Sequence, residues 1–175
     1  MADYYTNFSL IMALPDVAAR TYALELHQRM EEHRDDRRRA AGVPKSLWEE
    51  REGWHFACQA APGEPQPSLW LRSSDGGTDA ACAFIQHLLH QFQLREAGTV
   101  EWSHDCSKPR TDAYGGGAAF ITAHELRTFN TAEWVREQLE ARKAKPHRFS
   151  LETQLCVQCG VHSDDAAVGN TRCRD

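Results

Sequence analysis

Apolar and polar residues alternate near the start of the chain and then change to a helical period. The segment 5–12 has the alternation and composition of a β-strand. Pro15 and Asp16 follow it, and such a pair is typical of the first turn of a helix. Four later apolar residues fall on one stripe of that helix: Val17, Tyr22, Leu26 and Met30. The opening pattern therefore predicts a strand followed by a helix.

Two pairs of strands follow, and an amphipathic helix separates them. The segments 54–58 and 68–72 are strand-like and flank a proline-rich loop, which predicts a hairpin. Apolar residues over 81–92 recur with the clearest helical spacing in the chain. The segments 99–103 and 117–122 are strand-like again and predict a second hairpin.

Two capping patterns predict helices after the second hairpin. Thr122–Glu125 has the spacing of a capping box, so we expect a short helix there. Asn130–Glu133 has the same spacing and predicts a helix from about Thr131 to Lys145. We expect the buried side of this last helix to carry three apolar residues: Trp134, Val135 and Leu139.

The order of the predicted elements is β-α-β-β-α-β-β-α, which favours the α+β class. Hairpins separated by helices indicate an antiparallel or mixed sheet of about five strands, with the helices on one face. A single α+β domain over residues 1–149 holds all of these elements. Residues 150–175 are then a cysteine-rich C-terminal tail.

The composition and charge narrow the class of function. The chain has 175 residues, of which 41% are hydrophobic and 26% charged. Its formal net charge is -5 and its pI is near 6.0, whereas a dedicated nucleic-acid binder is expected to be basic. No apolar run approaches the roughly 20 residues that cross a bilayer, and the first residues lack a basic leader and an apolar segment. We expect a cytoplasmic protein that does not act at a membrane.

The tail carries the pattern with the most definite chemistry. Cys156 and Cys159 form a C-x-x-C pair directly before a glycine, a spacing that grips one tetrahedral ion from a single turn. His162 and Cys173 complete a possible set of four ligands. In a reducing cytoplasm such clustered thiols favour a metal site over a disulfide. The sequence therefore predicts a zinc ion held by this tail.

Other interpretations of the tail remain open. The fourth ligand would come instead from the body of the domain, with three candidates: Cys106, His104 and His147. A disordered or redox-sensitive tail, or a disulfide, also agrees with the pattern. Cys58 and Cys82 lie within a strand-like and a helical pattern, where small buried thiols are common.

A second segment rich in reactive and charged side chains lies between the strands of the second hairpin. His104 and Cys106 are two residues apart, and an imidazole beside a thiol favours the nucleophilic thiolate. Lys108 and Arg110 precede the triplet Gly115, Gly116 and Gly117, a combination that suits a phosphate group. No established phosphate-loop motif is present, however, and a glycine run that enters a strand more often marks a close approach of backbones.

Three patches of the chain resemble a known group of proteins. They are Ala2–Ser9, the segment Trp102–Arg110 together with Tyr114–Ala123, and the tail from Cys156 to Cys173. These patches are similar to those of small uncharacterised proteins encoded by bacteriophages, plasmids and prophages. The resemblance implies a bacterial host and a protein that binds one host protein, as inhibitors of CRISPR and other defence systems do.

Three functions follow as hypotheses. The first is a non-enzymatic binding protein of a mobile element that occludes a host nuclease complex, with Trp48, Trp54 and Arg110 as anchors. The second is a small enzyme or nucleotide-binding protein that uses the His104–Arg110 segment and the glycine triplet. The third is a DNA-associated regulator that uses a basic cluster near the end of the last helix: Arg142, Lys143, Lys145 and Arg148.

Overall fold

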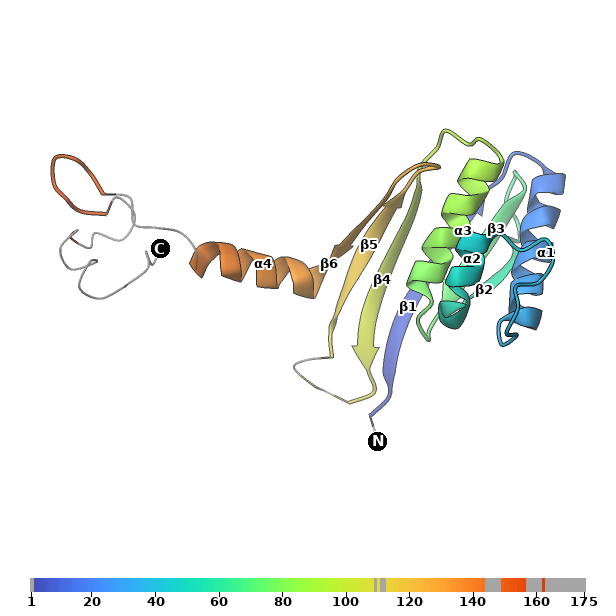
Figure 1. The fold of residues 1–175 in the computed structure, drawn as a ribbon, viewed down its shortest axis with the longest axis horizontal. Coiled ribbons are helices and arrows are strands. Elements are labelled where there is room, and N and C mark those ends of the chain that lie inside the picture. The colour runs from blue at the N-terminus through green and yellow to red at the C-terminus, as the bar shows by residue number, and fades with distance from the viewer. Residues whose placement is uncertain (1, 109, 111–112, 144–148, 157–161, 163–175) are drawn as a thin grey trace. The chain divides into compact units, whose positions relative to one another are not determined.

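The computed structural model describes residues 2–108, 110, 113–143, 149–156 and 162 (Figure 1). The chain divides into two compact units, Met1–Thr131 and Ala132–Asp175. None of the described helices is long and apolar enough to cross a membrane.

The first unit is a six-stranded antiparallel sheet with helices packed on it, so the protein belongs to the α+β class. Its helical elements are α1 (Val17–His33), α2 (Lys45–Glu49), the short 3-10 helix η1 (Arg51–Gly53) and α3 (Thr78–Gln91). Its strands are β1 (Tyr4–Ala13), β2 (Ala57–Ala60), β3 (Ser68–Ser73), β4 (Gly98–Cys106), β5 (Gly115–Ile121) and β6 (Leu126–Asn130).

The strand order explains how the sheet is assembled. The strands lie in the order β2-β3-β1-β4-β5-β6, and every ladder between them is antiparallel. The first four strands and the helices between them have the connectivity of the split β-α-β motif. The hairpin β5-β6 then extends the sheet beyond β4.

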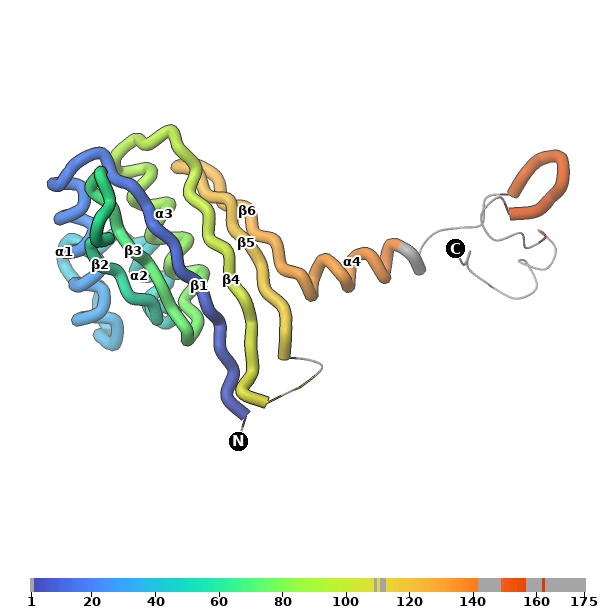
Figure 2. The backbone as a smooth tube through the Cα atoms, turned by 180° about the vertical axis from the view of Figure 1, so that it is seen from behind, coloured from blue at the N-terminus to red at the C-terminus, as the bar shows by residue number. Residues whose placement is uncertain are grey.

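The helices α1 and α3 cover one face of this sheet (Figures 1 and 2). Successive side chains of a strand point to opposite faces, and Phe8 and Met12 of β1 are buried with α1 residues such as Met30. Asp16 begins α1, because its carboxylate accepts a hydrogen bond of 2.7 Å from the backbone N–H of Ala19. The covered face is therefore the core of the unit.

An aromatic cluster closes the core at the C-terminal half of α1. Phe56 and Phe84 pack against Trp54, whose ring centroid lies 4.9 and 5.6 Å from theirs. The ring of His27 joins them, and its Nε2 lies 2.9 Å from the carbonyl oxygen of Phe56. Because the residue is 4% exposed, loss of solvation lowers the pKa of His27 below its ordinary value of 6.5.

The sheet has one strand more than the sequence predicts. The capping pattern at Thr122 does not start a helix: the Thr122 Oγ1 accepts a hydrogen bond of 2.9 Å from the Glu125 N–H, and the two backbones bond again at 2.8 Å. These bonds close the tight turn of the β5-β6 hairpin. The expected short helix was therefore wrong, because a threonine caps a turn as readily as a helix.

Two further predictions need correction. The strand expected over 54–58 begins at Ala57, because η1 and the turn after it occupy the preceding residues. The helix α2 at Lys45–Glu49 was not predicted, and it buries Leu47 completely. Leu47 and the partly buried Trp48 pack α2 against the core, whereas the other residues of this short helix are charged or polar.

The second unit contains the helix α4, which starts at the boundary and spans Thr131–Lys143. This agrees with the helix expected from about Thr131. Its side expected to be buried is not: Trp134, Val135 and Leu139 are 49%, 48% and 55% exposed.

Candidate protein-binding face

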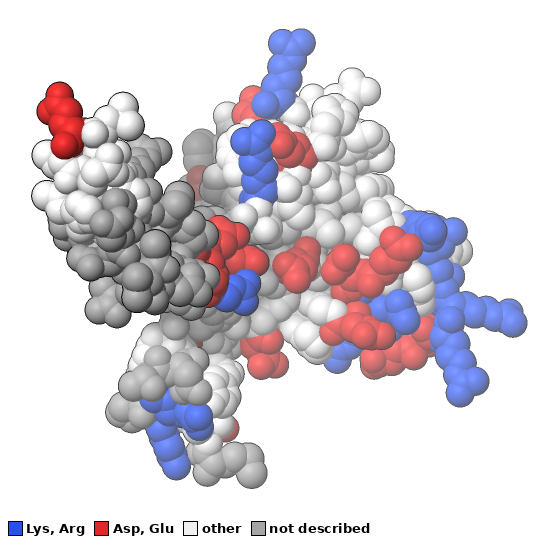
Figure 3. Space-filling view, turned by 60° about the vertical axis from the view of Figure 1, so that its left-hand side comes forward, with Lys and Arg blue, Asp and Glu red and all other residues white. Residues whose placement is uncertain are grey.

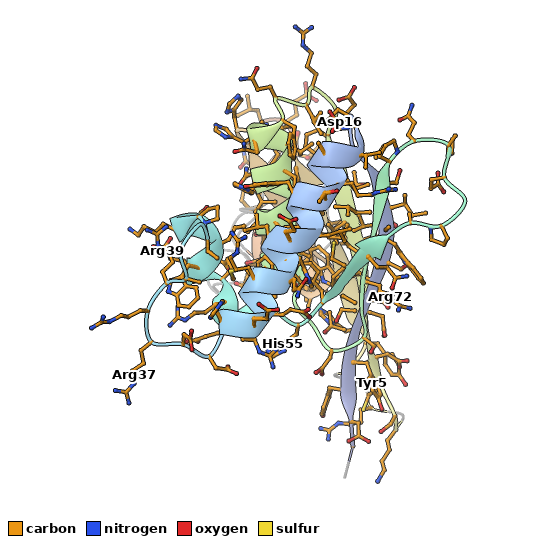
Figure 4. All side chains as sticks on the ribbon, turned by 90° about the vertical axis from the view of Figure 1, so that its right-hand side faces the viewer. Tyr5, Asp16, Arg37, Arg39, His55 and Arg72 are labelled. Atoms are coloured by element: carbon orange, nitrogen blue, oxygen red, sulfur yellow. The ribbon has the colours of Figure 1, made fainter. Side chains whose placement is uncertain are left out.

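The second face of the sheet carries no helix in the first unit, and we call it the open face (Figures 2 and 4). Figure 4 shows Arg72 and Tyr5 on the side of the strands away from α1. The strand register places these residues on it: Tyr5, Asn7, Ser9, Ile11, Trp70, Arg72, Glu101, Ser103, Ala118, Phe120, Arg127 and Phe129.

Aromatic side chains gather on the open face at β5 and β6. Ala118 lies opposite Phe129 in the ladder, and Phe120 lies one pair further along the same face. Phe120 is 47% and Phe129 46% exposed. Diagonal neighbours on an antiparallel pair are within reach of aromatic side chains. We call Ala118, Phe120 and Phe129 the apolar patch.

The other side of the open face is more polar. The Trp70 indole N–H donates a hydrogen bond of 2.8 Å to the Ser9 Oγ, and the guanidinium carbon of Arg72 lies 4.1 Å from the Trp70 ring centroid. These contacts fix the indole by its edge and its face. Trp70 was not among the predicted anchors. Its ring is held in one orientation on the open face by Ser9 and Arg72.

The strands β1 and β4 separate along their length and form a fork in the sheet. Tyr4–Asn7 pair with Ser103–Cys106, whereas Phe8–Ala13 pair with β3 on the other side. Among the described residues, no ladder pair joins β1 to β4 beyond Asn7. Figure 2 shows the two strands together near the N-terminus and apart at their other ends.

Two cavities open along this fork. The first is a shallow depression of about 1090 Å³ that includes Ser9, Arg72 and Glu101 of the open face and reaches Glu31 and Arg34 at the end of α1. The second, of about 470 Å³, lies where β1 and β4 are apart. Its lining is mainly aliphatic: Leu10, Ile11, Met12, Leu14, Ile85, Leu89 and Leu94, among others.

Charges of both signs are interleaved on the first unit. Figure 3 shows Lys and Arg side chains with Asp and Glu side chains among them on the face it presents. In the loop after α1, where Figure 4 labels Arg37 and Arg39, the Arg34 guanidinium lies 3.8 Å from the Asp35 carboxylate. Residues 34–39 carry four arginines and two aspartates, so neighbouring carboxylates offset part of the positive charge of this loop.

The three predicted anchors lie in different surroundings. Trp54 is 1% exposed and is a core residue, so it is not available to a partner. Trp48 is partly buried against the core, with the Arg51 guanidinium carbon 5.2 Å from its ring centroid. Arg110 is exposed, and its guanidinium carbon lies 5.9 Å from the Tyr4 ring centroid. The strand predicted over 54–58 did not by itself show that the Trp54 ring would be buried.

The His104 segment lies at the paired end of the fork. His104 and Cys106 are both on the covered face of β4, opposite Thr6 and Tyr4 of β1. The His104 Nδ1 is 3.0 Å from the Thr6 Oγ1, and Cys106 is 7% exposed. Lys108 follows the strand and is exposed. The structure thus brings the histidine to a threonine and leaves the thiol largely covered.

The glycine triplet has a packing role in β5. A Cβ at Gly117 would overlap the Trp102 ring and the Phe129 carbonyl, and one at Gly116 would overlap the Trp102 carbonyl. The Gly116 N–H donates a hydrogen bond of 3.1 Å to the Thr131 Oγ1. The absence of side chains therefore lets β5 pass closely between its neighbours. The predicted phosphate site at this triplet stays a prediction.

The predicted zinc ligands are described in part. Cys156 is 2% exposed, and isolated antiparallel bridges join Phe149 to Cys156 and Leu155 to His162. Cys159 and Cys173 lie outside the described residues, as do two residues of the predicted basic cluster, Lys145 and Arg148. Within the described part of the chain, no group of three or more metal-ligating side chains is placed to hold an ion.

Comparisons with known proteins found no match. No family model matches the chain, and neither a curated protein nor a solved structure matches it.

Proposed function

We propose that this is a non-enzymatic binding protein whose open face docks onto a host protein. The apolar patch carries the proposal, because Phe120 and Phe129 expose about half of their surface on the same helix-free face. Interfaces obtain most of their binding free energy from a few large side chains at a dry centre. On the same face Trp70 is already held by Ser9 and Arg72, so that ring would serve as an anchor at a small entropic cost.

The identity of the partner class rests on the resemblance to proteins of mobile elements. We propose a host defence complex, of the kind that anti-CRISPR proteins occlude, in the cytoplasm of a bacterial host. Occlusion requires surface and no chemistry, which agrees with the largely covered Cys106 thiol. In this proposal the apolar patch takes the anchoring role that the sequence had assigned to Trp54. Arg110 would lie at the rim of the interface.

The test is a double variant of the apolar patch on β5 and β6 with a matched control variant on β6. Tagged full-length chain is expressed in a bacterial host, its bound protein is identified by mass spectrometry, and the purified pair is titrated. We expect saturation near one to one and at least about a tenfold loss of affinity in Phe120→Ser/Phe129→Ser. Leu126→Ser is the control, because Leu126 is 41% exposed on β6, the strand of Phe129, but its side chain lies on the other face.

Two results would contradict the proposal. One is equal loss of affinity in the control and in the double variant, which would place the contact elsewhere. The other is a substoichiometric effect on the target that Cys106→Ala abolishes, which would favour an enzyme built on the His104 segment.

We also propose that the tail holds a structural zinc ion through Cys156, Cys159, His162 and Cys173. The described support is the bridge between Leu155 and His162, which places one predicted ligand, His162, beside the residue that precedes another, Cys156. Thiolate and imidazole ligands suit tetrahedral zinc. Metal analysis of reduced, full-length protein should give one zinc per chain, with loss in Cys156→Ser and retention in Cys58→Ser. Less than about a tenth of an ion per chain would contradict this.

A further inference from the structure

We infer that the fork between β1 and β4 receives an extended segment of the partner protein that carries a large apolar side chain next to a Lys or Arg. This rests on the proposed protein-binding function and names the chemistry that the partner presents. Three independent observations support it: the unpaired strand edges, the apolar cavity and the charge at the mouth of that cavity.

The strand edges favour a peptide over other ligands. From Phe8 onward β1 pairs only with β3, and Gly98–Trp102 of β4 pair only with β5, as far as the described residues show. At the open end of the fork, Leu10–Ala13 of β1 and Gly98–Thr99 of β4 line the cavity, and their N–H and C=O groups on that side have no partner strand among the described residues. Such rows are templates for an added strand, and recognition by strand addition draws its affinity from them.

The cavity provides the specificity for an apolar side chain. Ile85 and Leu89 of α3 lie beneath the fork, and a Cβ at Gly98 would contact both, so the helix already approaches the sheet as closely as the glycine permits. The remaining volume of about 470 Å³ is in the range of ligand pockets, roughly 300–1,000 Å³. Ile11, which is 54% exposed, stands at its edge on the open face.

The charge at the cavity selects a cationic neighbour. Glu96 is the single charged residue among the described residues that line the cavity, and Glu101 lies further along the same wall of β4. A Lys or Arg beside the inserted apolar side chain would face these carboxylates. Exposed pairs of this kind contribute little affinity individually but favour one register of the peptide.

The experiment uses random peptides against the full-length chain. A displayed library of 12-residue peptides is selected for binding to the immobilised protein. Peptides that also bind the variant Ala97→Trp are removed. Ala97 is an exposed residue at the cavity wall, and the larger tryptophan side chain is meant to fill the cavity. We expect enriched peptides to share a large apolar residue within two positions of a Lys or Arg. One synthetic peptide is then titrated by calorimetry.

The expected results separate the fork from the rest of the face. Ala97→Trp should weaken the peptide by about tenfold or more, and Glu96→Gln by about twofold to fivefold. Gln59→Trp, an exposed change on β2 away from the cavity, should leave the affinity unchanged. Hydrogen exchange should slow for backbone amides of residues 9–13. Thr99→Trp replaces Ala97→Trp if that variant does not fold.

Several outcomes would overturn the inference. No enrichment over the Ala97→Trp surface, or binding without slower exchange in β1, would exclude strand addition at the fork. A dimer of the chain that Ala97→Trp dissolves would assign the fork to a second copy. If the host partner binds Ala97→Trp normally but not Phe120→Ser/Phe129→Ser, the open face stays its docking surface and only the fork inference fails. If the host partner binds these two variants with equal affinity, the proposed function itself is contradicted.

Discussion

The two faces of the sheet are made by alternate residues of the same strands, yet they differ sharply in burial. On the covered face Val100 and Ile121 are fully buried under α3. On the open face the intervening Phe120 exposes 47% of its surface, and charged residues such as Glu101 and Arg72 lie among the apolar ones. The packed core therefore lies on one face, while the other keeps large side chains exposed to solvent.

The largest expected difference between the faces is in the cost of removing an aromatic ring. Phe84→Ala leaves a cavity beside Trp54 and should lower the free energy of unfolding by about 3–5 kcal/mol. Phe120→Ala on the open face should lower it by less than about 1 kcal/mol. Urea denaturation measures both, and similar costs would show that the open face is also a packed surface.

A smaller effect is expected where the strands approach most closely. Gly117→Ala places a methyl group against the Trp102 ring and should destabilise the protein by about 1–3 kcal/mol. The neighbouring change Ala118→Ser lies on the open face and should cost less than about 0.5 kcal/mol. A neutral Gly117→Ala in thermal unfolding would show that β4, β5 and β6 have room to separate.

Thiol reactivity distinguishes the faces without unfolding the protein. Burial, with Glu31 as a second cause, raises the pKa of Cys58 to about 12, and burial with Asp79 raises the pKa of Cys82 to about 12. Both thiols should therefore react with a disulfide reagent at pH 8 at least about tenfold more slowly than a cysteine introduced as Ala118→Cys. Peptide mapping after timed labelling measures the rates, and equal rates would contradict the assignment of faces.

The smallest effect is a dependence of stability on pH. Burial lowers the pKa of His27, and it also lowers the pKa of His87, whose Nε2 lies 2.9 Å from the Tyr22 hydroxyl. Since the unfolded state takes up protons near pH 6.5 and the folded state only at lower pH, the free energy of unfolding should fall as the pH drops below about 6.5. Denaturation at pH 7.5 and 5.5 tests this.

His87→Gln is the matched control for the pH effect. It should reduce the loss of stability between the two pH values, because one of the two neutral imidazoles is removed. An unchanged loss in this variant would assign the whole effect to His27 or to groups outside the core.

The sequence predicted the covered face better than the open one. The helical stripes of α1 and α3 and five of the six strands are visible in it, because burial imposes a period on apolar residues. The hairpin turn at Thr122 was mistaken for a helix start, since both use the same threonine contact. The open face was missed because its apolar residues follow the opposite phase of the strands, and only the register shows that Phe120 and Phe129 meet.

The most direct test of the account is the affinity of the captured host protein for the double variant Phe120→Ser/Phe129→Ser, compared with Leu126→Ser. The account predicts at least about a tenfold loss in the first and none in the second, with unfolding curves of both close to that of the unmodified chain. Retained affinity in the folded double variant would contradict it.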